Sequence, residues 1–491
     1  MTRLKKMNLA HSLFEHYVSM VTHQAAPYGN YSDIDYMADE YFNYSYQTIM
    51  SLDDSYMTKD GFDPKNGKVE AQIFMRRREG CLVAGIDPAL FLIVNCIPKE
   101  DLHLVEIGAV EDGTWVNYGG DPMEVEPVLV IRAPYRLIAR LETSILGIIA
   151  RCSRIATHVL EALEAANGSP VLFFPQRFDL PFTQELDGWA YHMAVEYYNE
   201  KYGKKLPQIV STRASAALWP DIAIVQGSTP HALFAVFGKD EVEAMIQMAK
   251  ALHPVFKRIF LADFNNDIAI STIKVATAYW MNYVKAYAAH DKKGMERWRL
   301  WGIRMDTSAA LTDASMSRKG LEHKGVNIPL VRTIREMIDY ELPQILLNAY
   351  PVTADNLGLT ETLDESQQRQ IEAGIREEAR NWCKGMSITV TGGFHPEKIK
   401  NFERGGQLGG LRAPVTAYGV GSGLLKNEGD LDFTMDLVRM WNSRHSEWRN
   451  VAKVGRAPGE NDNRQVVEAT DYTIYLVTGA LGFSGLENTF Y

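Results

Sequence analysis

Glycine-rich segments follow two short apolar runs in the second half of this sequence. Gly392-Gly393 follows the run Ser387–Thr391, and Gly421-Ser422-Gly423 follows Thr416–Val420. The bare backbone N–H groups of such turns, together with the N-terminus of a following helix, can bind a phosphate monoester. The pattern therefore favours a phosphorylated ligand.

Carboxylates, arginines and one histidine follow other apolar runs in the same way. Asp263, Asp267 and Asp306 could hold ribose hydroxyls or Mg²⁺. Arg177 and Arg304 could bind a carboxylate or a diphosphate through paired hydrogen bonds. Taken singly, a glycine pair can be a tight turn, an aspartate a helix N-cap, and His231 a loop residue. In combination they predict a site for a charged, phosphorylated sugar.

These residues need a scaffold in which strand ends converge. The expected strands are Val171–Phe174, Ile222–Val225, Ile259–Ala262, Trp301–Met305, Ser387–Thr391 and Thr416–Val420. The expected helices are 136–166, Gly188–Tyr202, Asp240–Ala251, Asp267–Ala289 and Asp364–Cys383. Strands that alternate with helices indicate parallel pairing. The sequence thus predicts an irregular or incomplete β/α barrel, whose functional residues collect at the carboxyl ends of its strands.

The first third of the chain has a different pattern. Residues 1–25 have the spacing of an amphipathic helix, and short apolar runs alternate with turns between about 68 and 133. The runs that we expect to be strands are Val83–Gly85, Leu90–Val94, Leu104–Val110 and Pro127–Arg132. We therefore predict an α/β fold in three parts. These are a mixed, partly antiparallel N-terminal domain over 1–135, the barrel over 136–440, and a C-terminal extension over 441–491 that packs back on the other domains.

Composition narrows the class of function. The 491 residues contain 51 Lys and Arg against 61 Asp and Glu, so the net charge is −10. This balance argues against a nucleic-acid partner. No apolar run approaches the roughly 20 residues that span a bilayer, so we expect no membrane partner. The four cysteines form no C-x-x-C pair, which favours a cytoplasmic setting and a chain without a resident metal site.

Several segments resemble, in order, the motifs of nicotinate phosphoribosyltransferases. They are Asp39–Phe42 (DEYF), Glu126–Val128 (EPV), Ala133–Tyr135 (APY), Glu142-Thr143, Leu146-Gly147, Ile155–Thr157 (IAT), Gly227–Leu233 (GSTPHAL), Arg304–Thr307 (RMDT), Arg335–Asp339 (REMID), Thr391–Ile399 (TGGFHPEKI), Tyr418–Leu424 (YGVGSGL) and Asp432–Val438 (DFTMDLV). The resemblance covers about residues 38–440. It implies a type II phosphoribosyltransferase fold, usually found as a homodimer.

The resemblance implies a reaction of NAD salvage. Nicotinate and 5-phosphoribosyl-1-pyrophosphate, taken with Mg²⁺, would give nicotinate mononucleotide and pyrophosphate. The implied catalytic residues are Asp306, Arg304, His231 and Asp263, and the implied substrate-binding residues are Tyr41, Arg177, Thr212, Gly392, Gly393, Gly421 and Ser422. Both Gly segments would hold the 5′-phosphate, Asp306 would face the ribose or the metal, and Tyr41 would stack on the nicotinate ring. His231 matches a histidine that some family members phosphorylate to couple ATP hydrolysis, which is optional here.

Three alternatives remain open at this point. A quinolinate phosphoribosyltransferase, which decarboxylates its substrate, would need a denser cationic pocket. Candidates for that pocket are Arg132, Arg136, Arg140, Arg151 and Arg154, although a solvated helix face is the simpler interpretation. A nicotinamide-using enzyme would need no arginine for a carboxylate. The third alternative is an inactive paralogue that binds a nucleotide as a sensor.

Overall fold

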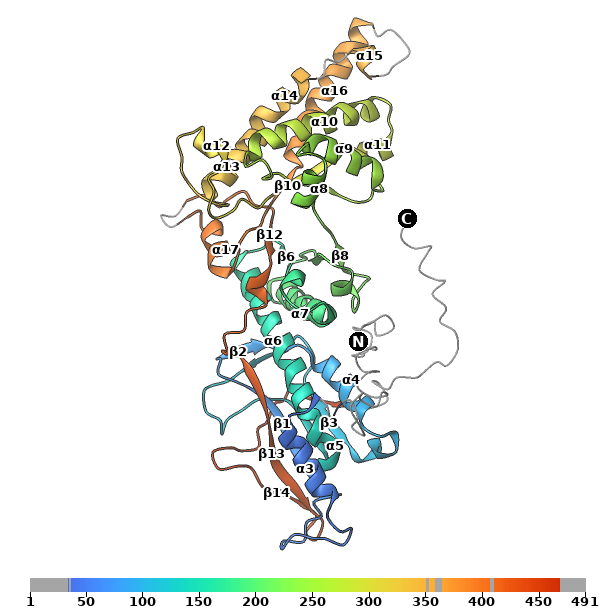
Figure 1. The fold of residues 1–491 in the computed structure, drawn as a ribbon, viewed down its shortest axis with the longest axis vertical. Coiled ribbons are helices and arrows are strands. Elements are labelled where there is room, and N and C mark those ends of the chain that lie inside the picture. The colour runs from blue at the N-terminus through green and yellow to red at the C-terminus, as the bar shows by residue number, and fades with distance from the viewer. Residues whose placement is uncertain (1–33, 35–36, 350–352, 358–363, 407–409, 469–491) are drawn as a thin grey trace, which may run out of the picture. The chain divides into compact units, whose positions relative to one another are not determined.

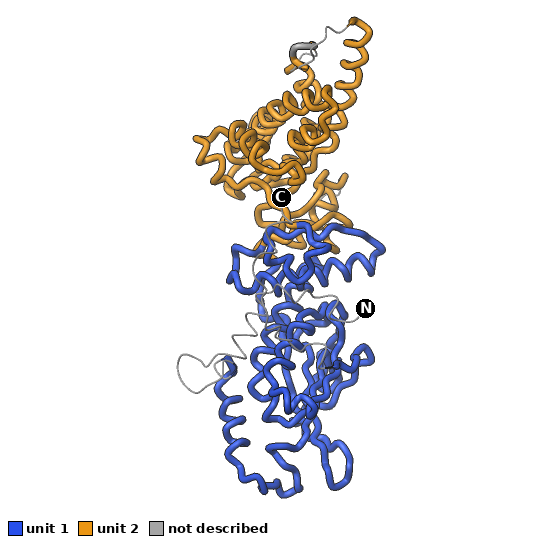
Figure 2. The backbone as a smooth tube through the Cα atoms, turned by 90° about the vertical axis from the view of Figure 1, so that its right-hand side faces the viewer, with its two compact units in different colours: residues 1–161, 175–224, 424–479 blue, residues 162–174, 225–423, 480–491 orange. Residues whose placement is uncertain are grey.

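The computed structural model describes residues 34, 37–349, 353–357, 364–406 and 410–468. The chain divides into two compact units, coloured separately in Figure 2. Unit 1 lies within Met1–Glu161, Pro175–Ile224 and Leu424–Gly479. The described residues of unit 2 lie within Ala162–Phe174 and Val225–Gly423.

Unit 1 is built on an antiparallel sheet. Its strands follow the order β14, β13, β1, β5, β3, β15, and every pairing between neighbours is antiparallel. The bounds are Lys68–Arg76 for β1, Glu106–Ala109 for β3, Pro127–Pro134 for β5, Asp432–Asn442 for β13, Glu447–Asn450 for β14 and Gln465–Val467 for β15. β1 pairs with β13 on one side (Figure 1) and with β5 on the other, and it is buried along nearly its whole length. Strands that begin after residue 431 therefore complete the sheet that the first 135 residues start.

Helices and short strands complete unit 1. The helical elements are α3 Glu40–Met50, α4 Ile86–Cys96, η3 Lys99–Leu104, α5 Tyr135–Ile138, η4 Ala139–Leu141, α6 Glu142–Ala165, η5 Gln176–Phe178, η6 Pro181–Thr183, α7 Gln184–Tyr202 and η7 Ala214–Ala216. The remaining strands are β2 Gly80–Leu82, β4 Trp115–Asn117, β7 Ile209–Val210 and β8 Ile224–Val225, which ends at the unit boundary. The predicted helical stretch over 136–166 is confirmed as α5, η4 and α6.

Several expected strands are wrong or shortened, and Leu104–Val110, for example, keeps only Glu106–Ala109 as β3. Leu90–Val94 belongs to helix α4, whose residues from Ile86 to Val94 are all buried. An uninterrupted apolar run fits a buried helix as well as a buried strand, so the pattern alone could not separate them. Val83–Gly85 lies between β2 and α4 outside any strand. The expected strand Ile222–Val225 contracts to the two exposed residues of β8.

Unit 2 contains a parallel sheet. Strands β6, β12, β11, β10 and β9 lie side by side in this order, and all four pairings are parallel. Their bounds are Val171–Phe173, Ala417–Val420, Ser387–Val390, Leu300–Met305 and Arg258–Leu261. The registers align Arg304 of β10 with Thr389 of β11 and Leu261 of β9. The predicted fold class, an incomplete β/α barrel with a partly antiparallel N-terminal domain, is confirmed.

Helices alternate with these strands, as the crossover connections of a parallel sheet require. They are α8 His231–Val236, α9 Glu241–Ala251, α10 Ile268–Ala288, α11 Lys292–Arg297, α12 Ala314–Ser317, α13 Ile328–Glu336, the π-helical turn η8 Met337–Glu341, α14 Leu342–Ala349, α15 Ala354–Leu357, α16 Glu365–Lys384, α17 Pro396–Glu403 and η9 Ser422–Leu424. α10, α14 and α16 pack together (Figure 1). A capping box, in which Asp364 and Gln367 exchange hydrogen bonds, begins α16.

The expected amphipathic helix over 1–25 lies outside the described residues. The predicted domain boundaries after 135 and 440 stay predictions. Of the tail after 440, the described part contributes β14 and β15 to the antiparallel sheet. Among the described helices, none is both long and apolar enough to cross a membrane.

Candidate active site

The candidate residues of unit 2 follow the carboxyl ends of adjacent parallel strands. Asp263 comes two residues after β9, Asp306 directly follows β10, and Gly392 comes two residues after β11. Since these strands are neighbours and run in the same direction, their following residues gather at one edge of the sheet. The sequence pattern predicted this grouping.

The Arg304 side chain connects three of the loops at this edge. Its Nε donates to Thr391 Oγ1 at 3.0 Å, Nη1 to Ser228 Oγ at 3.0 Å and Nη2 to Asp306 Oδ2 at 2.6 Å. The Arg304 and Asp306 side chains are each 19% exposed, so solvent can reach both. Thr391 Oγ1 in turn donates to the backbone oxygen of Met305. The guanidinium is thereby held in one orientation.

His231 and Asp263 form a second pair. The His231 Nε2 atom lies 3.0 Å from Asp263 Oδ1, with the imidazole 46% exposed and the carboxylate 7% exposed. Burial raises the pKa of Asp263, the negative charge of Asp306 adds to this shift, and the hydrogen bond from His231 opposes it. The preceding loop is held by Thr229, whose buried hydroxyl accepts a hydrogen bond from the Leu261 N–H at 2.8 Å. His231 is therefore fixed relative to β9.

The Gly392-Gly393 turn has a backbone that favours glycine. The φ angles are 86° and 67°, in the left-handed region. A Cβ atom on Gly392 would lie 3.2 Å from Asp306 Oδ1, whereas one on Gly393 would meet nothing within 4 Å. Gly393 is thus open to an approaching ligand, and Gly392 packs closely against the Asp306 carboxylate.

The second glycine segment follows β12. Gly421 is half-buried, and Ser422 is exposed at the start of η9. A Cβ atom on Gly423 would lie 3.4 Å from the backbone oxygen of Phe394. The two glycine segments therefore lie against each other, as the predicted phosphate site requires.

Two other aspartates near this edge serve as helix caps. Asp267 accepts a hydrogen bond from Ile270 N–H and pairs with both terminal nitrogens of Arg318, at 2.6 and 2.9 Å. Asp313 is fully buried and accepts from the N–H groups of Ile268 and Ser315. Asp267 therefore acts as a helix N-cap, and both of its carboxylate oxygens already accept hydrogen bonds from groups of the protein.

The other predicted site residues lie in unit 1. Tyr41 is 60% exposed on α3, and its hydroxyl donates to Asp39 Oδ2 at 3.2 Å. The Arg177 guanidinium lies 5.3 Å from the Phe178 ring centroid. Thr212 Oγ1 donates to Gln184 at 2.9 Å and accepts from the Ser215 N–H at 3.2 Å. The Thr212 hydroxyl thus already stabilises the turn that begins η7. The ligand roles of all three residues stay predictions.

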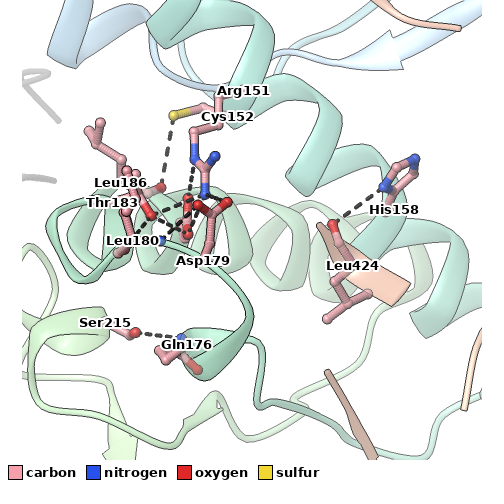
Figure 3. Close-up of polar contacts among 11 residues, drawn as sticks. Arg151, Cys152, His158, Gln176, Asp179, Leu180, Thr183, Leu186, Ser215 and Leu424 are labelled. Atoms are coloured by element: carbon pink, nitrogen blue, oxygen red, sulfur yellow. Dashed lines mark hydrogen bonds and ion pairs between the residues drawn. The ribbon is translucent and has the colours of Figure 1, made fainter. Parts of the chain in front are cut away.

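A partly buried ion cluster in unit 1 escaped the sequence analysis. Arg151 on α6 donates to Asp187 at 2.7 and 3.0 Å, to Asp179 at 2.7 Å and to Thr183 at 3.0 Å (Figure 3). Burial raises the pKa of Asp187, and the Arg151 charge opposes this shift. His158, two turns further along α6, donates through Nδ1 to the backbone oxygen of Leu424 at 3.3 Å (Figure 3). The residues of these contacts lie far apart in sequence, so no local motif predicts the cluster.

Of the five arginines considered above as a cationic pocket, most already pair with acidic or aromatic side chains of the protein. Arg132 pairs with Glu70 at 2.7 Å, Arg136 with Asp101 at 2.8 Å, and Arg140 lies 3.7 Å from the Tyr46 ring centroid. Arg151 belongs to the cluster above. The side chain of Arg154 is the exception, because it is buried and its Nε atom has no hydrogen-bond partner. A solvated helix face, the simpler interpretation, is therefore wrong for Arg154.

Among the residues that the structure describes, no group of three or more His, Cys, Asp and Glu side chains gathers as a metal site. All four cysteines are free thiols, and Cys81, Cys152 and Cys383 are buried. Burial raises the pKa of Cys81 to about 12, as expected for a thiol that packs rather than reacts.

Comparison with known proteins adds a family match and a shared fold. Residues 48–153 match the model of the quinolinate phosphoribosyl transferase N-terminal domain. The fold is shared with the crystal structure of nicotinate-nucleotide pyrophosphorylase from Pyrococcus furiosus, at 21% identity and a TM-score of 0.53, over 91% of this chain and 87% of that one. No curated protein sequence matches this chain. The matched model agrees, over residues 48–153, with the class that the motifs indicate, and the Pyrococcus furiosus structure shows a shared fold.

Two further structures are more distant. Human nicotinic acid phosphoribosyltransferase is 13% identical with a TM-score of 0.42, over 82% of this chain and 75% of that one. Nicotinate-nucleotide pyrophosphorylase from Francisella tularensis is 9% identical with a TM-score of 0.43, over 80% and 94%.

Proposed function

We propose that this protein is a type II phosphoribosyltransferase of NAD biosynthesis that transfers a phosphoribosyl group to nicotinate. The observation that supports this most directly is the grouping of Arg304, Asp306 and the Gly392-Gly393 turn at one edge of the parallel sheet. A cation, a carboxylate and an open glycine turn are what a charged phosphoribosyl substrate needs.

The proposed reaction exchanges one bond at the anomeric carbon of 5-phosphoribosyl-1-pyrophosphate. The C1′–O bond breaks, pyrophosphate leaves with the electron pair, and the pyridine nitrogen of nicotinate forms the C1′–N bond. The attacking nitrogen carries no proton, so no side chain has to act as a base. Catalysis then depends on positioning and on stabilising the departing negative charge. We assign that stabilisation to Arg304, and to the Mg²⁺ bound to the substrate.

The other residues have roles that follow from their chemistry. In this proposal Asp306 holds the ribose hydroxyls or the substrate-bound Mg²⁺, because its second oxygen is not used by Arg304. The turns at Gly392-Gly393 and Gly421-Ser422 bind the 5′-phosphate.

The test supplies 5-phosphoribosyl-1-pyrophosphate, Mg²⁺ and one pyridine at a time, and measures both pyrophosphate and mononucleotide. We expect product from nicotinate. Product from nicotinamide alone would replace the proposed substrate, and tight nucleotide binding without turnover would identify an inactive sensor.

Quinolinate is the second candidate, and one specific observation favours it. The matched model over residues 48–153 is that of a quinolinate phosphoribosyl transferase N-terminal domain. With this substrate the same bond exchange is followed by loss of CO₂, and a proton takes the place of the lost carboxylate. Release of CO₂ from quinolinate, with no product from nicotinate, would establish this candidate instead.

Coupling to ATP hydrolysis is a separate part of the proposal. Because Asp263 holds the Nε2 atom of His231, the neutral imidazole would place its proton there and leave the Nδ1 lone pair free to accept a phosphoryl group. If this coupling operates, ATP will raise the rate of the wild type and will have no effect on His231→Ala. We also propose a cytoplasmic homodimer, which light scattering of the purified protein can test.

A further inference from the structure

Lys398 occupies an unusual place beside the glycine turn. It is the third residue of helix α17, whose N-cap His395 makes no side-chain capping bond. The first turn of a helix has positive electrostatic potential, so a lysine there is unfavourable. Its side chain is also partly buried, and burial lowers the pKa of the Lys398 ammonium, although the negative charge of Asp306 opposes this shift. A charged group in so unfavourable a place calls for a specific partner.

That partner is the glycine turn. The Lys398 Nζ atom donates to the backbone oxygen of Gly392 at 3.0 Å and lies 4.2 Å from the centroid of the Phe394 ring. The contact with the aromatic face holds the ammonium in place from a second direction. No other described side chain donates to this carbonyl.

The bond to Gly392 O also determines where the next N–H points. In a planar trans peptide the C=O and the following N–H point in opposite directions. With its carbonyl bonded to Lys398, the peptide between Gly392 and Gly393 must direct the Gly393 N–H away from the lysine. That N–H has no bonding partner among the described residues, and the space beside Gly393 is open. Without the anchor, both left-handed glycines would be free to rotate this peptide.

We propose that Lys398 is a positioning residue that fixes the Gly392-Gly393 peptide so that the Gly393 N–H can donate to the 5′-phosphate of the substrate. This inference rests on the proposed function and adds a residue to its phosphate site. Lys398 acts through the backbone, while the glycine turn makes the contact with the phosphate.

The experiment compares three variants. Lys398→Met removes the ammonium and keeps the chain length, and Lys398→Arg keeps a donor within reach of Gly392 O. Lys400→Met is the matched control, because Lys400 is an exposed lysine on the same helix. Thermal melting is recorded for each. Binding of ribose 5-phosphate is measured by calorimetry, and KM is measured separately for 5-phosphoribosyl-1-pyrophosphate and for the pyridine.

For Lys398→Met we expect at least tenfold weaker binding of ribose 5-phosphate and a matching rise in KM for 5-phosphoribosyl-1-pyrophosphate, with KM for the pyridine unchanged. Lys398→Arg should recover most of the affinity, and Lys400→Met should equal the wild type. Wild-type affinity in Lys398→Met would overturn the proposal. So would a rise in both KM values accompanied by a lower melting temperature, which would indicate a structural role. If no pyridine is turned over, the proposed function fails, whereas the ribose 5-phosphate measurement still tests Lys398.

Discussion

The Arg304 Nη2 atom donates a 2.6 Å hydrogen bond to Asp306 Oδ2, between residues two positions apart at the end of β10. Through its other nitrogens Arg304 also holds Thr391 and Ser228. An anion that approaches Arg304 therefore meets a guanidinium that is already oriented. To bind it, the anion must compete with the Asp306 carboxylate. The pair stands at the centre of the proposed site, and its disruption should affect turnover more than folding.

We expect Asp306→Asn to lower kcat/KM at least about 100-fold, equivalent to about 2.7 kcal/mol, because the variant loses the negative charge that faces ribose or metal. The melting temperature should change little, since Asn can still accept a hydrogen bond from Arg304. Asp267→Asn is the matched control. Asp267→Asn also weakens an ion pair between an arginine and an aspartate, here Arg318 and Asp267. The new asparagine can still cap the N-terminus of α10. Equal activity of the two variants would reject the assigned role of Asp306.

Gly392→Ala should lower both the stability and the affinity for 5-phosphoribosyl-1-pyrophosphate. The φ of 86° is strained for alanine, at a cost of about 1–2 kcal/mol, and the new Cβ would press against Asp306 Oδ1 at 3.2 Å. Gly238→Ala separates the two effects, because Gly238 has φ 63° and open space around it. Urea unfolding should show a loss of stability in both variants, at least as large in Gly392→Ala because of the added contact with Asp306. Steady-state kinetics should show a rise in KM for Gly392→Ala alone.

Glu142 makes the stability of the protein depend on pH. Burial raises the pKa of Glu142 to about 8, and the nearby carboxylates of Asp436 and Asp39 add to the shift. A carboxyl whose folded-state pKa is raised stabilises the fold while it is protonated. That contribution is complete below about pH 4.5 and is lost as pH rises through about 8.

Glu142→Gln should therefore be more stable than the wild type at pH 9, by about 1–3 kcal/mol, with the difference shrinking towards pH 5. Denaturant titrations at a series of pH values provide the measurement. A stability difference that does not vary with pH would show that Glu142 does not titrate in this range.

The Arg151–Asp187 pair should matter for folding. The Asp187 side chain is only 4% exposed, so Arg151→Met would leave a buried carboxylate without its cation. Loss of one partner of a buried pair typically costs about 3–5 kcal/mol. The matched control is Arg369→Met, which breaks an exposed pair with Glu365 and should cost less than about 0.5 kcal/mol. If urea midpoints of the two variants coincide, the buried cluster does not contribute as described.

Much of the fold follows from local pattern. The alternation of apolar runs and helices after residue 136 predicted the parallel sheet, because period and spacing depend only on neighbouring residues. The same alternation placed Asp263, Asp306 and Gly392 at adjacent strand ends. Where local signals are ambiguous the prediction failed. The apolar run in α4 is buried on all sides, and such a run does not distinguish a helix from a strand.

Other features were decided by tertiary structure alone. No spacing reveals that β13 would pair with β1, that Arg151 would meet Asp187, or that Asp267 would be taken by Arg318. The Lys398 contact also depends on how α17 turns back on the glycines before it. By itself the sequence determined the residue types and the strand ends on which the chemistry depends. Only the fold decided which of those charges are left for a ligand, because an ion pair or a cap forms when distant parts of the chain are brought within hydrogen-bond distance.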